Sequence, residues 1–453
     1  MEGNNKGFAA LRLIKFVGAD RAVTFALLGN IVSLLFGPIT VLLIANNFSL
    51  EIQGYYYTFG SLATIILLAE LGLGEAVINF ASHEWSSLQF DAEGFLCGTP
   101  RALSRLVSLG RLLFQWYFVV ALLTVFVICP LGYIFFSRSH LGNDINWLGP
   151  WIALCVFQAI NITLLPAFYL LQGCNQVTSF WFYRLFQQLF NAFALWFAIL
   201  AGGNLWTVPF AVAIGLIWSG FFLKKNYCNF IYSLYTNVVT ERVNWLVEIW
   251  PVQKRMAATW LSKYVASQLF VPILFSASGP VVAGQMGMTM TLVSVLFALS
   301  SNWFVTKAPH FGMLVSQKKY KELDKGFVRA LLGAFLTGGV GLVGAIGFVV
   351  FLGYIEHPLS TRLFPPVVSG LFFLSSLLSS IIMGLSVYLR AHKQEPLVVV
   401  AMLASFMTLV STFISGRYFS VLGVAIAYLA ILAIFQLPFS LYIFWNSRAK
   451  WHI

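Results

Sequence analysis

Charged side chains are scarce in this chain. They make up 9% of its 453 residues, whereas soluble proteins carry about 25%. Hydrophobic residues make up 59%, and a soluble fold of this length leaves too much surface exposed to hide them. The composition therefore excludes an ordinary soluble protein and indicates one that lies in a membrane.

The sequence also lacks the patterns that hold metals and nucleotides. The cysteines form no CxxC pair and the six histidines no HExxH pattern. No GxxxxGKS or GxxxxGKT loop is present, so ATP is not the expected direct energy source. We predict no metal site and no cofactor, and we expect the cysteines to pack as small apolar side chains. The five are Cys97, Cys129, Cys155, Cys174 and Cys228.

Apolar runs long enough to cross about 30 Å of hydrocarbon recur along the whole chain. Each run must be helical, because lipid offers no hydrogen-bond partners to an open backbone. A membrane β-barrel would show short alternating segments instead. We therefore predict an all-α, polytopic membrane protein with about twelve transmembrane helices. The predicted spans are 22–45, 55–79, 107–136, 150–171, 180–201, 206–223, 257–278, 281–306, 327–352, 365–389, 397–415 and 420–446.

The basic residues predict the orientation of these spans. With the N-terminus inside, only Arg138, Arg362 and Arg417 of the 27 lysines and arginines fall in outward connections. This asymmetry predicts cytoplasmic N- and C-termini. The net charge of +12 then lies mainly on the cytoplasmic face, where it attracts anionic lipid headgroups. Nucleic acid is not an expected partner, since the basic residues are dispersed over many short connections.

The chain divides near its centre. The connection 224–256 separates an N-terminal half, 1–223, from a C-terminal half, 257–453, and each half holds six predicted spans. Two halves that both start inside and hold an even number of spans must be parallel repeats, related by an axis along the membrane normal. We therefore predict two six-helix bundles around a central cavity, an arrangement that suits alternating access.

The central connection carries a second pattern. As an amphipathic helix it would turn Trp245, Leu246, Ile249 and Trp250 toward lipid and Glu248 toward water. The alternative is a plain surface linker. The sequence leaves both readings open.

Several segments show family features. They are Gln53-Gly54-Tyr55-Tyr56-Tyr57-Thr58-Phe59, Glu70-Leu71-Gly72-Leu73, Phe80-Ala81-Ser82-His83-Glu84-Trp85, Trp250-Pro251-Val252-Gln253-Lys254-Arg255, Ala283-Gly284-Gln285-Met286-Gly287-Met288-Thr289, and Trp303 with Lys307-Ala308-Pro309. In these segments the chain resembles the O-antigen, or lipopolysaccharide, flippases of the multidrug/oligosaccharidyl-lipid/polysaccharide exporter superfamily. The resemblance implies that an undecaprenyl-diphosphate-linked oligosaccharide moves from the cytoplasmic to the periplasmic leaflet of a bacterial inner membrane. A proton or sodium gradient would supply the energy, and polysaccharide-assembly proteins would be partners.

Polar residues share one face of the predicted fifth span. Arg184, Gln188 and Asn191 stand at i, i+4 and i+7, which places them within about 60° of one another on a helix. Ionisable groups at membrane depth usually face protein or a water-filled cavity. These three are therefore candidates for a cavity wall that meets phosphate or sugar hydroxyls, or for a structural polar seam between helices.

Two further spans carry basic candidates. In the predicted seventh span, Lys263 and Ser267 lie on one face, and a lysine there could hold a diphosphate as a compact cation. Arg111, in the third span, is a shallower candidate. The alternative for both basic residues is that their long side chains reach the membrane interface without binding substrate.

The second predicted span holds two carboxyl groups. Glu70 lies near its middle, so this group is either protonated or has a partner. Glu70 and Glu75 are candidates for proton or sodium coupling, or for neutral groups in a helix seam. They are about 140° apart around a helix, so they do not form one paired-carboxylate site.

Matching positions of the two halves carry a further set of polar residues. His83 and Glu84 follow the second span of the first half, and Lys307 and His310 follow the second span of the other. This set is a candidate for an inner gate or a diphosphate-loading site. The alternative is a solvated loop edge.

Three classes of function compete on this sequence. A flippase for a lipid-linked oligosaccharide is the first. A multidrug or organic-cation exporter of the same superfamily is the second, and it would favour acidic cavity residues over Arg184 and Lys263. A membrane-embedded glycan polymerase or ligase is the third. It is disfavoured because the outward connections are short and leave little room for a catalytic site, so we predict a transporter and not an enzyme.

Overall fold

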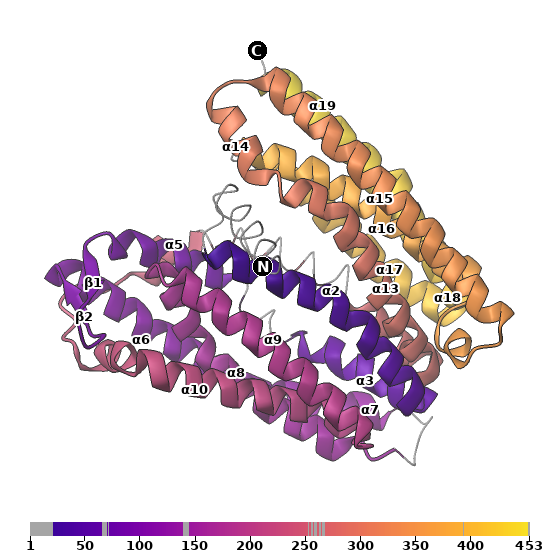
Figure 1. Cartoon of the computed structure of the whole chain (residues 1–453), viewed down its shortest axis with the longest axis horizontal. Helices are drawn as coiled ribbons and strands as arrows, with labels where there is room; N and C mark the ends of the chain where they lie inside the picture. The colour runs from indigo at the N-terminus through magenta and orange to yellow at the C-terminus, as the bar shows by residue number, and fades with distance from the viewer. Residues whose placement is uncertain are drawn as a thin grey trace, which may run out of the picture. The chain divides into compact units, whose positions relative to one another are not determined.

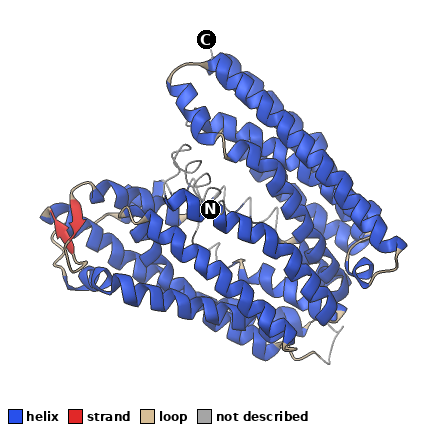
Figure 2. Cartoon of the chain, viewed as in Figure 1, coloured by secondary structure: helices blue, strands red, loops and turns tan. Residues whose placement is uncertain are grey.

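The computed structural model describes residues 21–65, 70, 72–138, 145–251, 253–254, 257, 261, 264, 268–392 and 394–451. Within this part nearly all of the chain is helical (Figure 2). Nine helical segments there are long and apolar enough to cross a membrane, and each coincides with a predicted span. Helix α9 (Val177–Leu200) lies at the predicted fifth span. The prediction of an all-α, polytopic membrane protein is therefore confirmed.

The helices form two compact units. The first takes in the described parts of 1–43, 72–134 and 146–254, and the second those of 44–71, 135–145 and 255–453. The first unit contains most of α2 (Arg21–Asn47), α5 (Leu73–Trp85), α6 (Pro100–Leu123), α8 (Leu148–Gly173), α9 and α10 (Thr207–Thr236). The second contains α3 (Leu50–Ala63), α12 (Phe270–Ser278), α13 (Pro280–Val305), α14 (Ala308–Ser316), α15 (Tyr320–Tyr354), α16 (Pro366–Ala391), α17 (Val398–Tyr418), α18 (Ser420–Ala430) and α19 (Leu437–Trp451).

Helix α3 comes from the predicted N-terminal half but packs in the second unit, against α13. Glycines allow the close approach. A Cβ on Gly54 would stand 1.9 Å from the carbonyl oxygen of Pro280, and one on Gly287 would stand 2.2 Å from the ring of Tyr57. The buried Gln53 donates from Nε2 to the Gly284 carbonyl at 2.9 Å. The packing units therefore differ from the predicted halves in this segment.

The second predicted span is not one continuous helix. Helix α3 ends at Ala63, and Thr64, Glu70 and Gly72 lie in turns before α5 begins at Leu73. Gly72 has φ of +70°, a left-handed conformation that costs glycine little and interrupts a helix. Within the described residues, the predicted span 55–79 is therefore interrupted at Gly72.

Helix α10 is longer than predicted. It runs to Thr236, with a kink at Tyr227, and so extends beyond the predicted span 206–223. The reason is that its last turns still bury Phe230 and Leu234 in the first unit. Along the unit, α6, α8 and α10 lie side by side (Figure 1).

The central connection is docked on the first unit, so the alternative of a plain linker does not describe it. Ser104 of α6 accepts from the backbone N–H groups of Thr240 and Glu241 at 2.8 Å each. A π-turn, η3, spans Trp245–Ile249. Ile249 is buried in the unit, not turned to lipid as predicted, because η3 folds back on α6. Glu248 pairs with Arg105 instead of pointing to water.

The remaining elements are short and connect the helices. Segment η1 (Thr124–Ile128) joins α6 to α7 (Cys129–Ser137), and η5 (Ile431–Gln436) joins α18 to α19; both are π-helical. Strands β1 (Leu88–Phe90) and β2 (Leu96–Gly98) form an antiparallel hairpin with Leu88 opposite Gly98. The 3-10 turns η2 (Asn204–Trp206) and η4 (Pro358–Arg362) precede α10 and α16.

Aromatic residues fill the core of the second unit where α15, α16 and α19 meet. The ring of Phe327 lies 5.0 Å from that of Tyr388 and 5.6 Å from that of Phe444. Beside them, the Tyr388 hydroxyl donates to Asp324 at 2.6 Å, and Arg448 forms a two-point ion pair with the same carboxylate. Asp324 thus ties three helices together, because its two oxygens accept from both α16 and α19.

Candidate functional site

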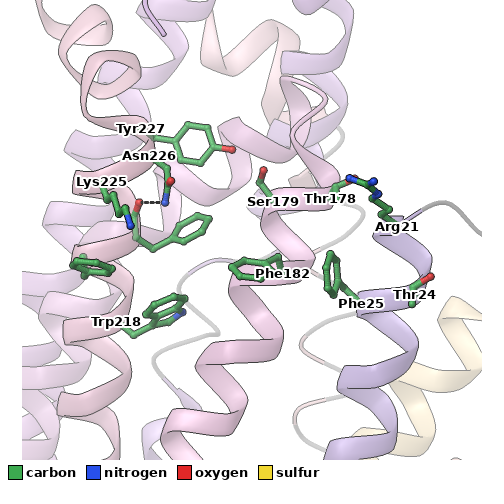
Figure 3. Close-up of a pocket in the computed structure, with 12 residues that line it drawn as sticks. Arg21, Thr24, Phe25, Thr178, Ser179, Phe182, Trp218, Lys225, Asn226 and Tyr227 are labelled. Carbon is green, nitrogen blue, oxygen red and sulfur yellow. Dashed lines mark hydrogen bonds between the residues drawn. The ribbon is translucent and has the colours of Figure 1, made fainter. Parts of the chain in front are cut away.

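A cavity of about 940 Å³ opens in the first unit, where the start of α2, the start of α9 and the middle of α10 come together (Figure 3). Its lining combines cationic, hydroxyl and aromatic side chains. The lining residues are Arg21, Thr24, Phe25, Thr178, Ser179, Phe182, Trp218, Phe221, Phe222, Lys225, Asn226 and Tyr227. We call this the α2–α9–α10 pocket.

The polar part of the pocket carries two cations. Arg21 begins α2, and Lys225 lies on α10, with its Nζ 5.7 Å from the ring centre of Phe221. In Figure 3, Thr178 and Ser179 of α9 lie between Lys225 and Arg21. The lining residues that the structure describes include two basic side chains and no carboxylate, so they contribute positive charge to the pocket.

A local distortion of α10 shapes this polar part. Tyr227 departs from helical geometry, with φ of −136° and ψ of 22°. Its hydroxyl donates to Gln176 Oε1 at 3.3 Å, just before α9 begins. The neighbouring Asn226 bonds back to the Phe222 carbonyl at 3.0 Å. Tyr227 therefore ties α10 to the start of α9 at the edge of the pocket.

The apolar part is a wall of aromatic rings. The Phe25 and Phe182 rings meet edge to face with centroids 5.5 Å apart, and Trp218 lies 5.9 Å from Phe222. Phe182 and Phe222 are 6.5 Å apart and join the two pairs. Such a wall can pack on an isoprenoid chain or stack on a sugar ring, while the cations beside it suit a phosphate.

The predicted polar face of α9 lies outside this lining, and its members contact different neighbours. Arg184 is exposed and donates to Gln187 Oε1 at 3.1 Å. Gln188 donates to Ser33 of α2 at 3.2 Å. Asn191 turns toward α10, where a Cβ on Gly215 would stand 2.1 Å from its Oδ1.

That Asn191 oxygen is buried and has no hydrogen-bond partner within the described residues. Gln188 and Asn191 thus lie at helix contacts, as the structural-seam alternative expects. A role for these residues or Arg184 in substrate binding stays a prediction.

Of the other cavity candidates, Arg111 is among the described residues. Arg111 donates to the backbone carbonyls of Leu234 and Tyr235 at 2.8 Å each, and also to that of Asn237. Its guanidinium therefore caps the end of α10, where free carbonyls favour a cation. Lys263 and Ser267 lie outside the described residues.

The predicted ion-coupling residues lie at the break between α3 and α5. Glu70 is half-buried in the turn, and Glu75 is exposed in the first turn of α5. Carboxylates are favourable at a helix N-terminus, which accounts for Glu75 without coupling. A coupling role for Glu70 stays a prediction.

The predicted gate residues have contrasting surroundings. In the first unit, His83 is exposed, while Glu84 accepts from Arg105 Nε at 2.8 Å. In the second unit, Lys307 lies 6.0 Å from the ring centre of Trp303, and His310 is exposed. Glu84 is therefore part of an ion network, whereas the gate role of the set stays a prediction.

Sequence reasoning missed Arg21 and Lys225 as site residues. Lys225 was assigned to the connection because α10 was expected to end earlier. One signal could have found Lys225. It follows Trp218 and Phe221 or Phe222 at steps of three or four residues, which is the spacing of one helix face. Arg21 gave no such signal, since its position beside α9 depends on tertiary packing.

Comparison with solved structures defines the class of fold. No protein-family model and no curated protein matches the chain, but transporters of the MOP superfamily match over nearly its whole length, and the chain has their fold. One is a multidrug resistance MATE transporter in an inward-facing conformation (TM-score 0.66, 11% identity, 94% of this chain and 99% of that chain). Another is the lipid II flippase MurJ in an inward closed conformation (TM-score 0.68, 14% identity, 93% and 87%). A third is a MOP superfamily transporter from Pyrococcus furiosus (TM-score 0.52, 14% identity, 95% and 94%).

Proposed function

We propose that this protein is a flippase that moves a lipid-linked oligosaccharide across the membrane by alternating access. The expected substrate is an undecaprenyl-diphosphate-linked glycan, carried from the cytoplasmic to the periplasmic leaflet of a bacterial inner membrane for surface polysaccharide synthesis. The activity is transport, without making or breaking a covalent bond. A proton or sodium gradient would drive it, and proteins of polysaccharide assembly would be its partners.

The composition of the α2–α9–α10 pocket is the observation that carries this proposal. Arg21 and Lys225 bring two cations to the described lining, and the aromatic wall lies directly beside them. A diphosphate attached to an isoprenoid has the matching chemistry, an anionic group joined to an apolar chain. That one of the similar folds is a lipid II flippase supports the same substrate class.

A multidrug exporter is the second candidate, because MATE transporters share the fold. Its organic-cation substrates would be repelled by Arg21 and Lys225. The charge of the pocket therefore favours the flippase.

The test is transport by the purified protein in proteoliposomes. The probe is a fluorescent undecaprenyl-diphosphate disaccharide, and its passage to the opposite leaflet is read by a membrane-impermeant quencher. We expect the double variant Arg21→Gln/Lys225→Gln to slow transport at least tenfold, because one lost hydrogen bond to a charged group costs about 1.5–3 kcal/mol.

The matched control is Lys224→Gln, which removes an exposed charge next to Lys225 but outside the pocket lining. It should transport as the wild type does. If the double variant transported the lipid as fast as the wild type does, the pocket would have no role in transport. Transport of ethidium but not of the lipid by the wild-type protein would favour the exporter.

A further inference from the structure

Three basic residues form a row at the start of α15. Lys321, Lys325 and Arg329 stand at i, i+4 and i+8 and are all exposed. Each step of four residues turns a helix by about 40°, so the three side chains lie on one face, one above the other. We call this row the basic foot of α15.

The same helix face continues as an apolar stripe. Leu332, Leu336, Val340 and Val343 follow Arg329 at steps of three or four residues and are 57%, 64%, 75% and 71% exposed. In a helix long and apolar enough to span a membrane, such a stripe faces lipid. The face thus changes from cationic to apolar between Arg329 and Leu332.

The length of α15 places this change near the membrane surface. The helix has 35 residues, or roughly 52 Å at 1.5 Å per residue. About 20 residues suffice to cross the hydrocarbon. The surplus carries the basic foot into the headgroup region, and the long helix is visible in Figure 1.

The cations of the foot lack counter-charges in the part of the chain that the structure describes. Among the described residues, none of Lys321, Lys325 and Arg329 takes part in an ion pair. The nearby acids are engaged elsewhere. Glu322 approaches Lys319 at 4.0 Å, and Asp324 is held by Arg448 and Tyr388. Three positive charges therefore remain for a partner outside the protein.

A second helix, α17, has an exposed apolar stripe but no basic row at its start. Helix α17 exposes Val399, Leu403, Phe406 and Phe413, which are 50–65% exposed. Its first turns contain no basic residue. The basic foot thus distinguishes α15 from α17.

We propose that the face of α15 from Lys321 to Val343 binds an anionic phospholipid of the leaflet that borders the start of this helix. The phosphate lies against the basic foot, and one acyl chain runs along the stripe from Leu332. This site is independent of the α2–α9–α10 pocket and of the proposed transport.

Native mass spectrometry of the detergent-solubilised full chain tests this assignment. Phosphatidylglycerol and phosphatidylcholine with the same acyl chains are titrated separately. The wild-type protein should bind phosphatidylglycerol at least tenfold more tightly. In Lys321→Gln/Lys325→Gln/Arg329→Gln this affinity should fall on the order of 100-fold, since each basic residue at a membrane surface contributes roughly fivefold.

Two matched variants complete the design. Lys224→Gln/Arg242→Gln/Lys450→Gln removes the same number and kind of exposed charges elsewhere and should bind as the wild type does. Lys321→Arg/Lys325→Arg/Arg329→Lys keeps the charge of the foot and should also retain binding. Thermal unfolding of each variant checks that it is folded.

Three results would overturn the proposal. One is an equal loss of phosphatidylglycerol binding in the control triple variant, which would indicate general charge attraction. Another is equal binding of both phospholipids by the wild-type protein. The third is a foot variant that loses undecaprenyl diphosphate but keeps phosphatidylglycerol, because the foot would then receive the lipid carrier and not a phospholipid.

Discussion

At the scale of single residues, Arg105 joins two carboxylates of the first unit. Its guanidinium donates to Glu84 at the end of α5 and to Glu248 in η3, and all three side chains are at most 28% exposed. Partly buried ion pairs of this kind depend on every member being present, because losing one leaves a charge with poor solvation. Arg105 therefore couples the docked connection to the C-terminal end of α5.

Glu248 should make the docking of the connection pH-dependent. The backbone N–H of Asn244 donates to its carboxylate at 2.9 Å and, together with Arg105, lowers the pKa of Glu248. A carboxyl group whose pKa is lower in the folded state stabilises that state above its unfolded pKa, roughly 4.3 for Glu. The contribution is lost as the pH falls through the lowered pKa. Amide hydrogen exchange of residues 240–249, corrected for intrinsic rates, should accelerate in that window.

In Glu248→Gln, the amide hydrogens of residues 240–249 should exchange quickly at every pH. The variant has no charge at this position and no group that titrates there. The control is Glu241→Gln, whose pair with Arg101 is far more exposed and contributes little. Its exchange should follow the wild-type pH dependence. A wild-type pH profile in Glu248→Gln would contradict the assignment.

At the scale of elements, the α3–α13 pair depends on glycine more than on any side chain. In Gly54→Ala the new methyl group would meet the Pro280 backbone, with its carbonyl oxygen at 1.9 Å and its carbonyl carbon at 2.5 Å. Neither atom belongs to a flexible side chain, so the helices must separate. Overpacking of this kind costs about 1–3 kcal/mol, and thermal unfolding of the purified protein should show a lower Tm.

Gly60→Ala is the matched control in the same helix. No atom of the described residues lies within 4 Å of a Cβ at this position, and alanine favours a helix over glycine by roughly 0.5–1 kcal/mol. Its Tm should be unchanged or slightly raised. Equal Tm values for the two variants would show that the contact with Pro280 is not tight.

A comparison of predicted and observed helix ends shows which features the sequence can predict. Helix α13 begins within one residue of its predicted start because Gly279 and Pro280 signal it locally, with φ of +89° at Gly279. The break at Gly72 was missed, since hydropathy averages over a window and cannot report one left-handed residue. The pocket was missed for a different reason: it depends on the non-helical Tyr227 and on how α2 packs beside α9, and neither leaves a periodic pattern.

At the scale of the whole molecule, the distribution of basic residues predicts the topology. Only Arg138, Arg362 and Arg417 of the 27 fall in connections assigned to the outside. Reporter fusions after Asn143 and Glu356 should therefore read periplasmic, and one within 318–325 should read cytoplasmic. The opposite reading at any of these positions would change the span assignment there.

The π-helical segment η1 has a consequence for altering the length of this chain. Each π turn holds one residue more than an α-helical turn needs. The π turn therefore absorbs one extra residue, and deleting one residue from Thr124–Ile128 would restore α-helical geometry while the residues after it keep nearly the same phase relative to α6. The same deletion from the regular part of α6 would rotate everything after it by about 100°. A chimera joined within η1 therefore tolerates the loss of one residue, whereas one joined in the middle of α6 must keep its residue count.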